Sequence, residues 1–178
     1  MERRSLTEYV VLGALIAEPR HGYEIKQFIE ATLESTWRVS TSQLYALLRR
    51  LTKERLIRGN LEMQKTRPSK RVFTLTDEGT QIFIDWLHDP TAHVRDFRME
   101  FLTKLFFFFQ YSIPGATALV DSQRHELERH LEETRKQSER DIDPFKRLVL
   151  EFRIHTMESL CSWLSTEARA FAQKLKNV

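Results

Sequence analysis

The residues of this chain best suited to chemistry are cationic and lie in one short stretch. Positions 49–71 hold nine Lys and Arg residues and only two acidic residues, Glu54 and Glu62. The whole chain has a formal net charge of only +3, so this basic cluster is local. Cationic side chains at such density favour binding to a row of phosphates, as in a nucleic acid. The alternative interpretation is an ordinary solvated face.

A short helix overlaps the start of the cluster and would position part of it. An apolar i, i+3, i+4, i+7 stripe predicts this helix, and Ser40 to Ser42 supply capping side chains. The stripe consists of Leu44, Leu47, Leu48 and Leu51. At about 100° per residue, the opposite face holds Ser42, Ala46, Arg49 and Lys53, flanked by Gln43, Tyr45 and Arg50. Small, hydrogen-bonding and cationic groups in this pattern could read a DNA groove.

Two strand-like segments follow the helix. The first runs from Leu56 to Met63, and the second, Arg71 to Thr76, alternates between the two faces of a strand. The polar tip between them, QKTRPSK, predicts a hairpin with a cationic, solvated end. A small helix followed by a basic hairpin is typical of a winged helix-turn-helix, in which the hairpin contacts the DNA backbone.

The rest of the chain predicts helices, which begin near Leu6, Tyr23 and Thr76 and again near Phe97, Pro114 and Phe145. The predicted fold is mainly α with a small β-hairpin. We expect a winged helix-turn-helix DNA-binding domain over residues 1–90. A helical, coiled-coil-like dimerisation and effector domain is expected over residues 91–178. Its last helix carries more apolar surface than so few helices can bury, which favours a partner helix from a second chain.

Several function classes find little support. No segment has the length and hydropathy of a membrane span, and we expect no signal peptide. The single cysteine, Cys161, excludes an internal disulfide framework and fits a reducing cytoplasm; we interpret it as a core residue rather than a redox sensor. His125 and His130 are five residues apart on a helix and point too far apart to share a zinc ion. We predict no catalytic residue, no metal site and no cofactor.

The motifs and their order resemble the PadR family of bacterial transcriptional regulators. The resemblance is strong over residues 1–90, and the segment from Arg98 to Phe107 is similar to the C-terminal region of longer members, which include virulence activators. The motifs are His21-Gly22-Tyr23-Glu24-Ile25, Ser40-x-Ser42-Gln43-Leu44-Tyr45-x-x-Leu48-x-x-Leu51, Phe73-x-Leu75-Thr76-x-x-Gly79 and Trp86-Leu87.

This resemblance implies a homodimer that exchanges its C-terminal helices and binds promoter DNA. It implies repression in most cases, often relieved by a small molecule at or near the dimer interface. The chain departs from the family pattern at Arg55, where glycine is common, and at Phe73, where tyrosine is common. Arg55 requires the recognition helix to end without a glycine and could add a phosphate contact.

These observations lead to one set of candidate site residues. We predict groove contacts from Ser42, Gln43 and Tyr45 and phosphate contacts from Arg49 and Lys53, with the hairpin adding Lys65, Arg67, Lys70 and Arg71. Tyr23, near a helix N-terminus, is either a phosphate contact or a structural hydrogen-bonding residue. An aromatic effector cavity could involve Phe106, Phe152, His155 and Trp163, although such residues more often form a plain dimer core.

The function predicted from the sequence is that of a cytoplasmic, homodimeric regulator of transcription. Its partners would be double-stranded promoter DNA, a second copy of the chain and a small aromatic effector. The alternative is a helical adaptor whose basic hairpin binds a protein or an acidic surface.

Overall fold

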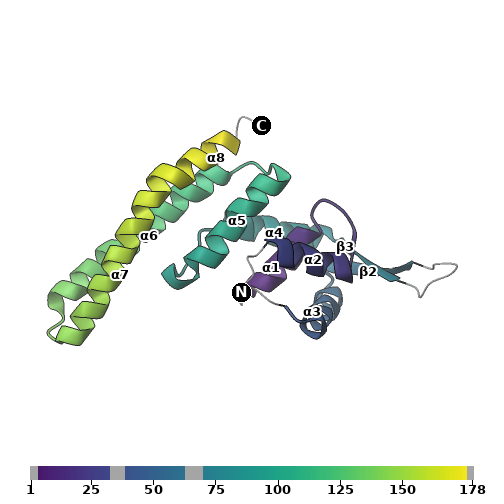
Figure 1. Cartoon of the computed structure of the whole chain (residues 1–178), viewed down its shortest axis with the longest axis horizontal. Helices are drawn as coiled ribbons and strands as arrows, with labels where there is room; N and C mark the ends of the chain where they lie inside the picture. Colours follow the sequence, from purple (N-terminus) through teal and green to yellow (C-terminus); the bar gives the residue numbers. More distant parts are fainter. Residues whose placement is uncertain (1–3, 33–38, 63–69, 176–178) are drawn as a thin grey trace. The chain divides into compact units, whose positions relative to one another are not determined.

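The computed structural model describes residues 4–32, 39–62 and 70–175 and divides into two compact units, Met1–Leu87 and His88–Val178. The mainly helical fold with a small sheet agrees with the sequence prediction (Figure 1). The elements up to the start of the second unit are α1 (Leu6–Ala14), β1 (Arg20–His21), α2 (Gly22–Thr32), α3 (Thr41–Lys53), β2 (Ile57–Glu62), β3 (Lys70–Leu75) and α4 (Asp77–His88).

The predicted hairpin is present as β2 and β3, which pair antiparallel from Ile57 opposite Leu75 to Glu62 opposite Lys70. A third strand was not predicted. Arg20 and His21 form β1, which pairs antiparallel with β3 and gives the sheet order β1-β3-β2. A two-residue strand is too short to show the alternation by which strands are predicted from sequence, and it depends on its partner strand.

Helix α3 is oriented by a buried apolar stripe. Leu44, Leu48 and Leu51 are fully or almost fully buried. Leu47 is only half-buried, so the stripe is narrower than its spacing suggested. The helix begins with the predicted cap: the Ser40 hydroxyl accepts a hydrogen bond from the Gln43 backbone N–H at 3.2 Å, and Gln43 Oε1 accepts one from the Ser40 N–H at 3.0 Å. This reciprocal pair satisfies two of the N–H groups that a helix start leaves open.

Helix α3 ends without a glycine. Arg55 adopts the left-handed conformation, with φ of 61°. The Arg55 N–H then bonds the Thr52 carbonyl at 3.1 Å, and the Leu56 N–H bonds the Leu51 carbonyl at 3.0 Å. This is a Schellman ending, which normally uses glycine at the position of Arg55. The left-handed conformation costs a non-glycine residue about 1–2 kcal/mol.

An ionic cluster joins the start of α1 to α3. The buried Glu8 carboxylate accepts hydrogen bonds from the Ser5 N–H and hydroxyl at 2.8 and 2.9 Å, and it pairs with Arg50 at 2.8 Å and Arg4 at 3.1 Å. Arg4 also pairs with Glu54 at 2.6 Å. Burial alone would raise the pKa of Glu8, but the Ser5 hydrogen bonds and the two guanidinium groups outweigh it and lower that pKa.

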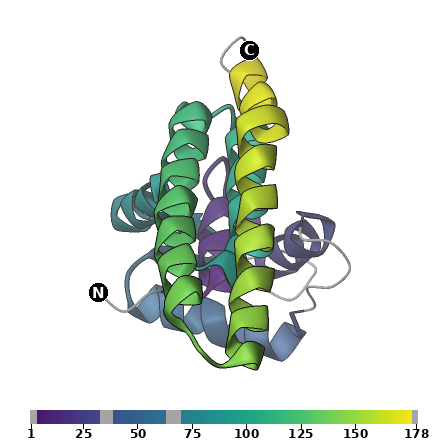
Figure 2. The same cartoon turned by 90° about the vertical axis from the view of Figure 1, so that its left-hand side faces the viewer.

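The second unit is helical. After a short 3-10 turn (Val94–Asp96), it contains α5 (Phe97–Tyr111), α6 (Ala116–Arg140), α7 (Pro144–Trp163) and α8 (Arg169–Leu175). A π-helical segment, Leu164–Ala168, joins α7 to α8 where a single helix was expected. Figure 2 shows α6 lying antiparallel to the α7–α8 rod. Pro144 occupies the first turn of α7, and Asp143 caps it by accepting from the Phe145 and Lys146 N–H groups.

Phenylalanines dominate the core of the second unit, and two polar contacts are buried with them. Phe101, Phe107 and Phe108 are fully buried. The Lys104 ammonium, also fully buried, pairs with Glu100 at 2.9 Å and donates to the Asp89 carbonyl at 2.5 Å.

In the described part of the chain, no helix has both the length and the apolar character needed to cross a membrane.

We expect Glu8→Gln to destabilise the protein at neutral pH by on the order of 1–3 kcal/mol, because a buried charged acceptor is lost. A carboxylate whose folded-state pKa is lowered stabilises the fold above its unfolded-state pKa, and this contribution is lost as pH falls through the folded-state pKa. The difference in unfolding free energy between Glu8→Gln and the wild type should therefore become smaller in acid. Urea unfolding at several pH values measures this difference.

Glu30→Gln is the matched control, since Glu30 is exposed and, among the described residues, pairs only with Lys26, at i, i+4 and 3.6 Å. It should change stability by less than about 0.5 kcal/mol. Equal effects of the two substitutions would contradict a structural role for the Glu8 cluster.

Candidate nucleic-acid interface

The outward face of α3 carries the predicted mixture of small, polar and cationic groups. Ser42, Ala46, Arg49 and Lys53 are all exposed. Within the described residues, neither Arg49 nor Lys53 has an ion-pair partner, whereas the adjacent Arg50 is held by Glu8 and Glu54. Two cations that no carboxylate neutralises are available to an external anion such as a phosphate. This face can therefore bind a polyanion without first breaking an ion pair.

Gln43 is more constrained than a free groove-reading side chain. Its Oε1 is already used in the helix cap, which leaves its amide N–H groups as the available donors. Ser42 is also partly engaged, because its hydroxyl lies 3.1 Å from the Ser40 hydroxyl. The role of Ser40 in capping was predicted, whereas the part that Gln43 plays in the same cap was not. The spacing Ser40-x-x-Gln43 was the signal that could have revealed it.

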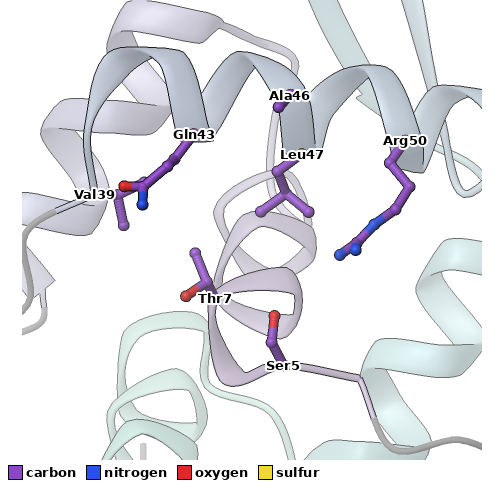
Figure 3. Close-up of a pocket in the computed structure, with 7 residues that line it drawn as sticks. All are labelled: Ser5, Thr7, Val39, Gln43, Ala46, Leu47 and Arg50. Atoms are coloured by element: carbon purple, nitrogen blue, oxygen red, sulfur yellow. The ribbon is translucent and has the colours of Figure 1, made fainter.

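A groove of about 550 Å³ separates this flank of α3 from the start of α1. Figure 3 shows Gln43, Leu47 and Arg50 extending from α3 toward the side that carries Ser5 and Thr7. The half-buried state of Leu47 is explained by this groove. Ala46 also lines this groove, so the exposed face of α3 and the groove beside α1 meet at this residue.

Tyr45 connects α3 to the first residue of α2. Its side chain is 41% exposed, and its ring lies over Gly22. A Cβ atom added to Gly22 would lie 2.9 Å from Tyr45 Oη and 3.0 Å from Cζ, closer than real contacts allow. The glycine of the His-Gly-Tyr-Glu motif therefore makes room for the tyrosine of the Ser-Gln-Leu-Tyr motif. The Tyr45 ring thus packs against the start of α2 while part of the side chain stays exposed.

The other residues of the first motif organise the same corner. The His21 N–H donates to Glu24 Oε2 at 2.7 Å, so Glu24 caps the start of α2. His21 Nδ1 lies 3.4 Å from the Arg71 carbonyl in β3. Tyr23 is 66% exposed, and its hydroxyl accepts a hydrogen bond from Gln27 at 3.1 Å, which leaves its proton available to another acceptor.

The hairpin residues are described only in part. Lys65 and Arg67 lie outside the described residues, and Lys70 is placed only by its backbone pairing with Glu62. Arg71 is exposed, and its Cγ and Cδ lie against Gly59 of β2. The aliphatic part of Arg71 therefore rests on the strand while its charge reaches solvent.

Arg58 is an exposed cation that the sequence analysis counted but did not single out. It lies on β2 opposite Thr74 and adds positive charge to the base of the hairpin. Its position in a predicted strand beside the basic hairpin tip is the feature of the sequence that could have identified it.

The four predicted effector residues are dispersed over the second unit. Phe152 is 72% exposed, and His155 is exposed with Nδ1 2.8 Å from the Glu151 carbonyl. Trp163 packs edge-on against Phe97 and Phe101, while Phe106 contacts Phe107. Of the four, Phe152 alone lines the cavity found in the described part of this unit.

Cys161 is half-buried on α7. Burial raises the pKa of its thiol, with Glu128 adding to the effect, so the thiol is protonated at neutral pH and is a weak nucleophile.

Comparisons with known proteins match two families to different parts of the chain. Residues 11–84 match the transcriptional regulator PadR-like family, and residues 97–171 match the virulence activator alpha C-terminal family. The chain is 34% identical over 119 residues to the negative transcriptional regulator PadR of Bacillus subtilis, covering 65% of this chain and 64% of that protein, which is less than two thirds of its length. It is 24% identical over 165 residues to the probable transcriptional regulator Rv1176c of Mycobacterium tuberculosis, covering 92% and 76%.

Among solved structures, Bacillus subtilis PadR in complex with operator DNA is 25% identical, with a TM-score of 0.49 and coverage of 94% of this chain and 98% of that one. The same protein in complex with p-coumaric acid is 24% identical, with a TM-score of 0.40 and coverage of 94% and 99%.

We predict that Gly22→Ala moves the Tyr45 ring and destabilises the wild-type protein by about 1 kcal/mol, as overpacking does. In a Tyr45→Ala background the same substitution should be neutral or stabilising by about 0.4–1 kcal/mol, because alanine reduces the entropy of the unfolded chain. Thermal or urea unfolding of the wild type, the two single variants and the double variant gives the coupling free energy between Gly22 and Tyr45.

Tyr23→Ala provides the matched background, since Tyr23 adjoins Gly22 in the chain and is 66% exposed. There, Gly22→Ala should cost what it costs in the wild type. Equal costs in all three backgrounds would show that Tyr45 does not rest on Gly22.

Proposed function

Because residues 11–84 match the PadR-like family of transcriptional regulators, we propose that the chain acts as a homodimer that binds double-stranded promoter DNA. The name of its Bacillus subtilis relative, a negative transcriptional regulator, supports repression as the direction of control. We also propose that a small aromatic effector weakens DNA binding, and that the protein works in the cytoplasm, where a bacterial chromosome lies.

The observation that carries the DNA-binding proposal is the exposed face of α3. Its opposite side is buried through Leu44, Leu48 and Leu51, so Ser42, Ala46, Arg49 and Lys53 are presented together. A small residue at the centre, with unpaired cations beside it, permits close approach to a groove and contact with its phosphates. The hairpin supplies further cations for the adjacent backbone, which contribute affinity rather than sequence preference.

The homodimer is supported by an apolar stripe on the surface of α7. Phe145, Leu148, Val149 and Phe152 follow i, i+3, i+4, i+7 spacing and are 71, 61, 43 and 72% exposed. Ile142, just before the helix, is 93% exposed. Burying large apolar side chains contributes roughly 1.5–3 kcal/mol each, so a surface of this length favours association. We propose that a second copy of the chain covers this α7 stripe.

The adaptor alternative uses the same hairpin to bind a protein or an acidic surface. It gives no role to the outward face of α3, where Ala46 is flanked by polar and cationic groups. It also predicts indifference to DNA sequence. A duplex selected from a random pool, bound more tightly than unselected duplexes, would exclude it.

We predict different effects for the hairpin and for α3 when binding to a selected duplex is measured over a range of salt. Arg67→Ala with Lys70→Ala should weaken binding to all duplexes and reduce the slope of log affinity against log salt by roughly 0.9 per lost contact. Tyr45→Ala should mainly reduce the preference for the selected duplex.

Lys174→Ala controls for loss of charge, since Lys174 is an exposed cation on α8 in the other unit. An unchanged salt slope in the double variant would remove the hairpin from the interface. Undiminished preference in Tyr45→Ala would mean that this residue does not contribute to sequence reading.

We predict that the wild-type protein is a dimer by light scattering and that Leu148→Glu shifts it to monomer. An unpaired carboxylate inside an apolar interface is strongly unfavourable. Arg147→Glu places the same group on the same helix outside the α7 stripe and should leave the dimer intact. A monomeric wild type, or a dimeric Leu148→Glu protein, would contradict the proposed interface.

A further inference from the structure

The turn that follows α3 holds an arginine in a backbone conformation that costs stability. Arg55 has φ of 61°, and its side chain is exposed. In this left-handed region a side chain's Cβ crowds the backbone, whereas glycine meets no such conflict. Residues held in such conformations are concentrated at sites that bind or react, where the side chain has a use that offsets the strain.

The backbone of Arg55 is fixed on both sides, so the strain cannot relax. Its N–H donates to the Thr52 carbonyl at 3.1 Å, and its carbonyl accepts from the Thr76 hydroxyl at 2.9 Å. The next residue, Leu56, is almost fully buried, and its N–H donates to the Leu51 carbonyl at 3.0 Å. Any other conformation of Arg55 would break these bonds, and the arginine side chain therefore leaves the turn from a defined point.

Arg55 belongs to a run of exposed cations that continues past the end of α3. Arg49 and Lys53 precede it on the outward face of the helix, and Arg58 follows it on β2. Among the residues that the structure describes, none of these four cations has an ion-pair partner. We call Arg55 and Arg58 the α3–β2 corner. Cations that follow one another along a surface match the regular row of phosphates on a nucleic-acid strand.

The acidic residue closest to the corner in the chain is already neutralised. Glu54 is the one carboxylate within residues 49–61. Arg4, from the segment before α1, pairs with it at 2.6 Å, and Arg50 lies 3.9 Å from it. If Arg4 released Glu54, the carboxylate would adjoin Lys53 and Arg55 in the chain and would compete with a phosphate for them. Arg4 therefore preserves the positive charge of the corner without being part of it.

We propose that the α3–β2 corner binds the phosphate backbone of DNA, with Arg55 contacting a phosphate beyond those contacted by the outward face of α3 and by the hairpin tip. Arg4 is a positioning residue, because it occupies Glu54. The choice of ligand rests on the proposed function, whereas the strain at Arg55 does not. The phosphate contact offsets that strain when DNA is bound.

Urea unfolding of the full chain measures the strain. Arg55→Gly should lower the equilibrium constant for unfolding by roughly twofold to tenfold, because relief of strain exceeds the entropy that glycine adds to the unfolded chain. Arg49→Gly, at a helical position of α3, should instead raise that constant about fivefold. An Arg55→Gly protein no more stable than the wild type would overturn the strain at Arg55.

Binding to the selected duplex over a range of salt tests the contact itself. Arg55→Asn removes the charge and supplies a residue that tolerates the left-handed conformation. It should reduce the slope of log affinity against log salt by roughly 0.9. Arg55→Lys, which keeps the charge, should retain the wild-type slope.

Lys174→Gln, which removes an exposed cation from the other unit, should also leave the slope unchanged. An unchanged slope in Arg55→Asn would overturn the contact. A reduction of the same size in Lys174→Gln would overturn it too, because net charge alone would then explain the effect.

The positioning role of Arg4 is tested by a second substitution. Arg4→Gln should weaken binding to all duplexes, and Glu54→Gln added to it should restore the wild-type affinity, because the released carboxylate is then absent. If Arg4 contacted DNA itself, Glu54→Gln would restore nothing, and that result would overturn its positioning role.

Inorganic polyphosphate, a polyanion without bases, separates the corner from the proposed function. Polyphosphate should bind Arg55→Asn more weakly than the wild type and Arg55→Lys. A wild type that binds no duplex but shows this order would overturn the proposed function and leave the corner as a phosphate site. If it binds no duplex and the three proteins bind polyphosphate equally, the corner falls as well.

Discussion

Burial of Leu44, Leu48 and Leu51 is the constraint on which the first unit depends. Helix α3 has thirteen residues, and its rotation about its own axis decides which of its side chains face outward. The three leucines fix that rotation because turning them outward would expose apolar side chains worth roughly 1.5–3 kcal/mol each. Ser42, Ala46, Arg49 and Lys53 face outward as a consequence. The Glu8–Arg50 pair and the Tyr45–Gly22 contact then hold the two flanks of the same helix.

Two sequence motifs twenty residues apart become one structural feature in this arrangement. Gly22 is needed less for its own backbone than for the space it leaves to Tyr45. Glu24 caps the start of α2, which is where the Tyr45 ring rests. Arg55, in contrast, adopts the left-handed backbone conformation that glycine adopts more readily than other residues.

Features that depend on neighbouring residues were predictable from the sequence. The Ser40 cap, the Thr76 cap of α4 and the start of α7 at Pro144 follow from local hydrogen bonding and backbone geometry. Features that depend on distant partners were not. Strand β1 exists only because β3 pairs with it, and Leu47 is half-buried because of a groove beside α1. The dispersal of Phe106, Phe152 and Trp163 depends on how the helices pack, which the apolar pattern of each helix alone does not specify.

The orientation of α3 can be tested directly by the protection of cysteines from a maleimide reagent, in a chain whose Cys161 is replaced by serine. Single cysteines would replace Ala46 on the outward face and Gln81 on the exposed surface of α4. The account predicts that a selected duplex slows labelling at position 46 strongly and at position 81 little. Equal labelling at position 46 with and without the bound duplex would contradict it.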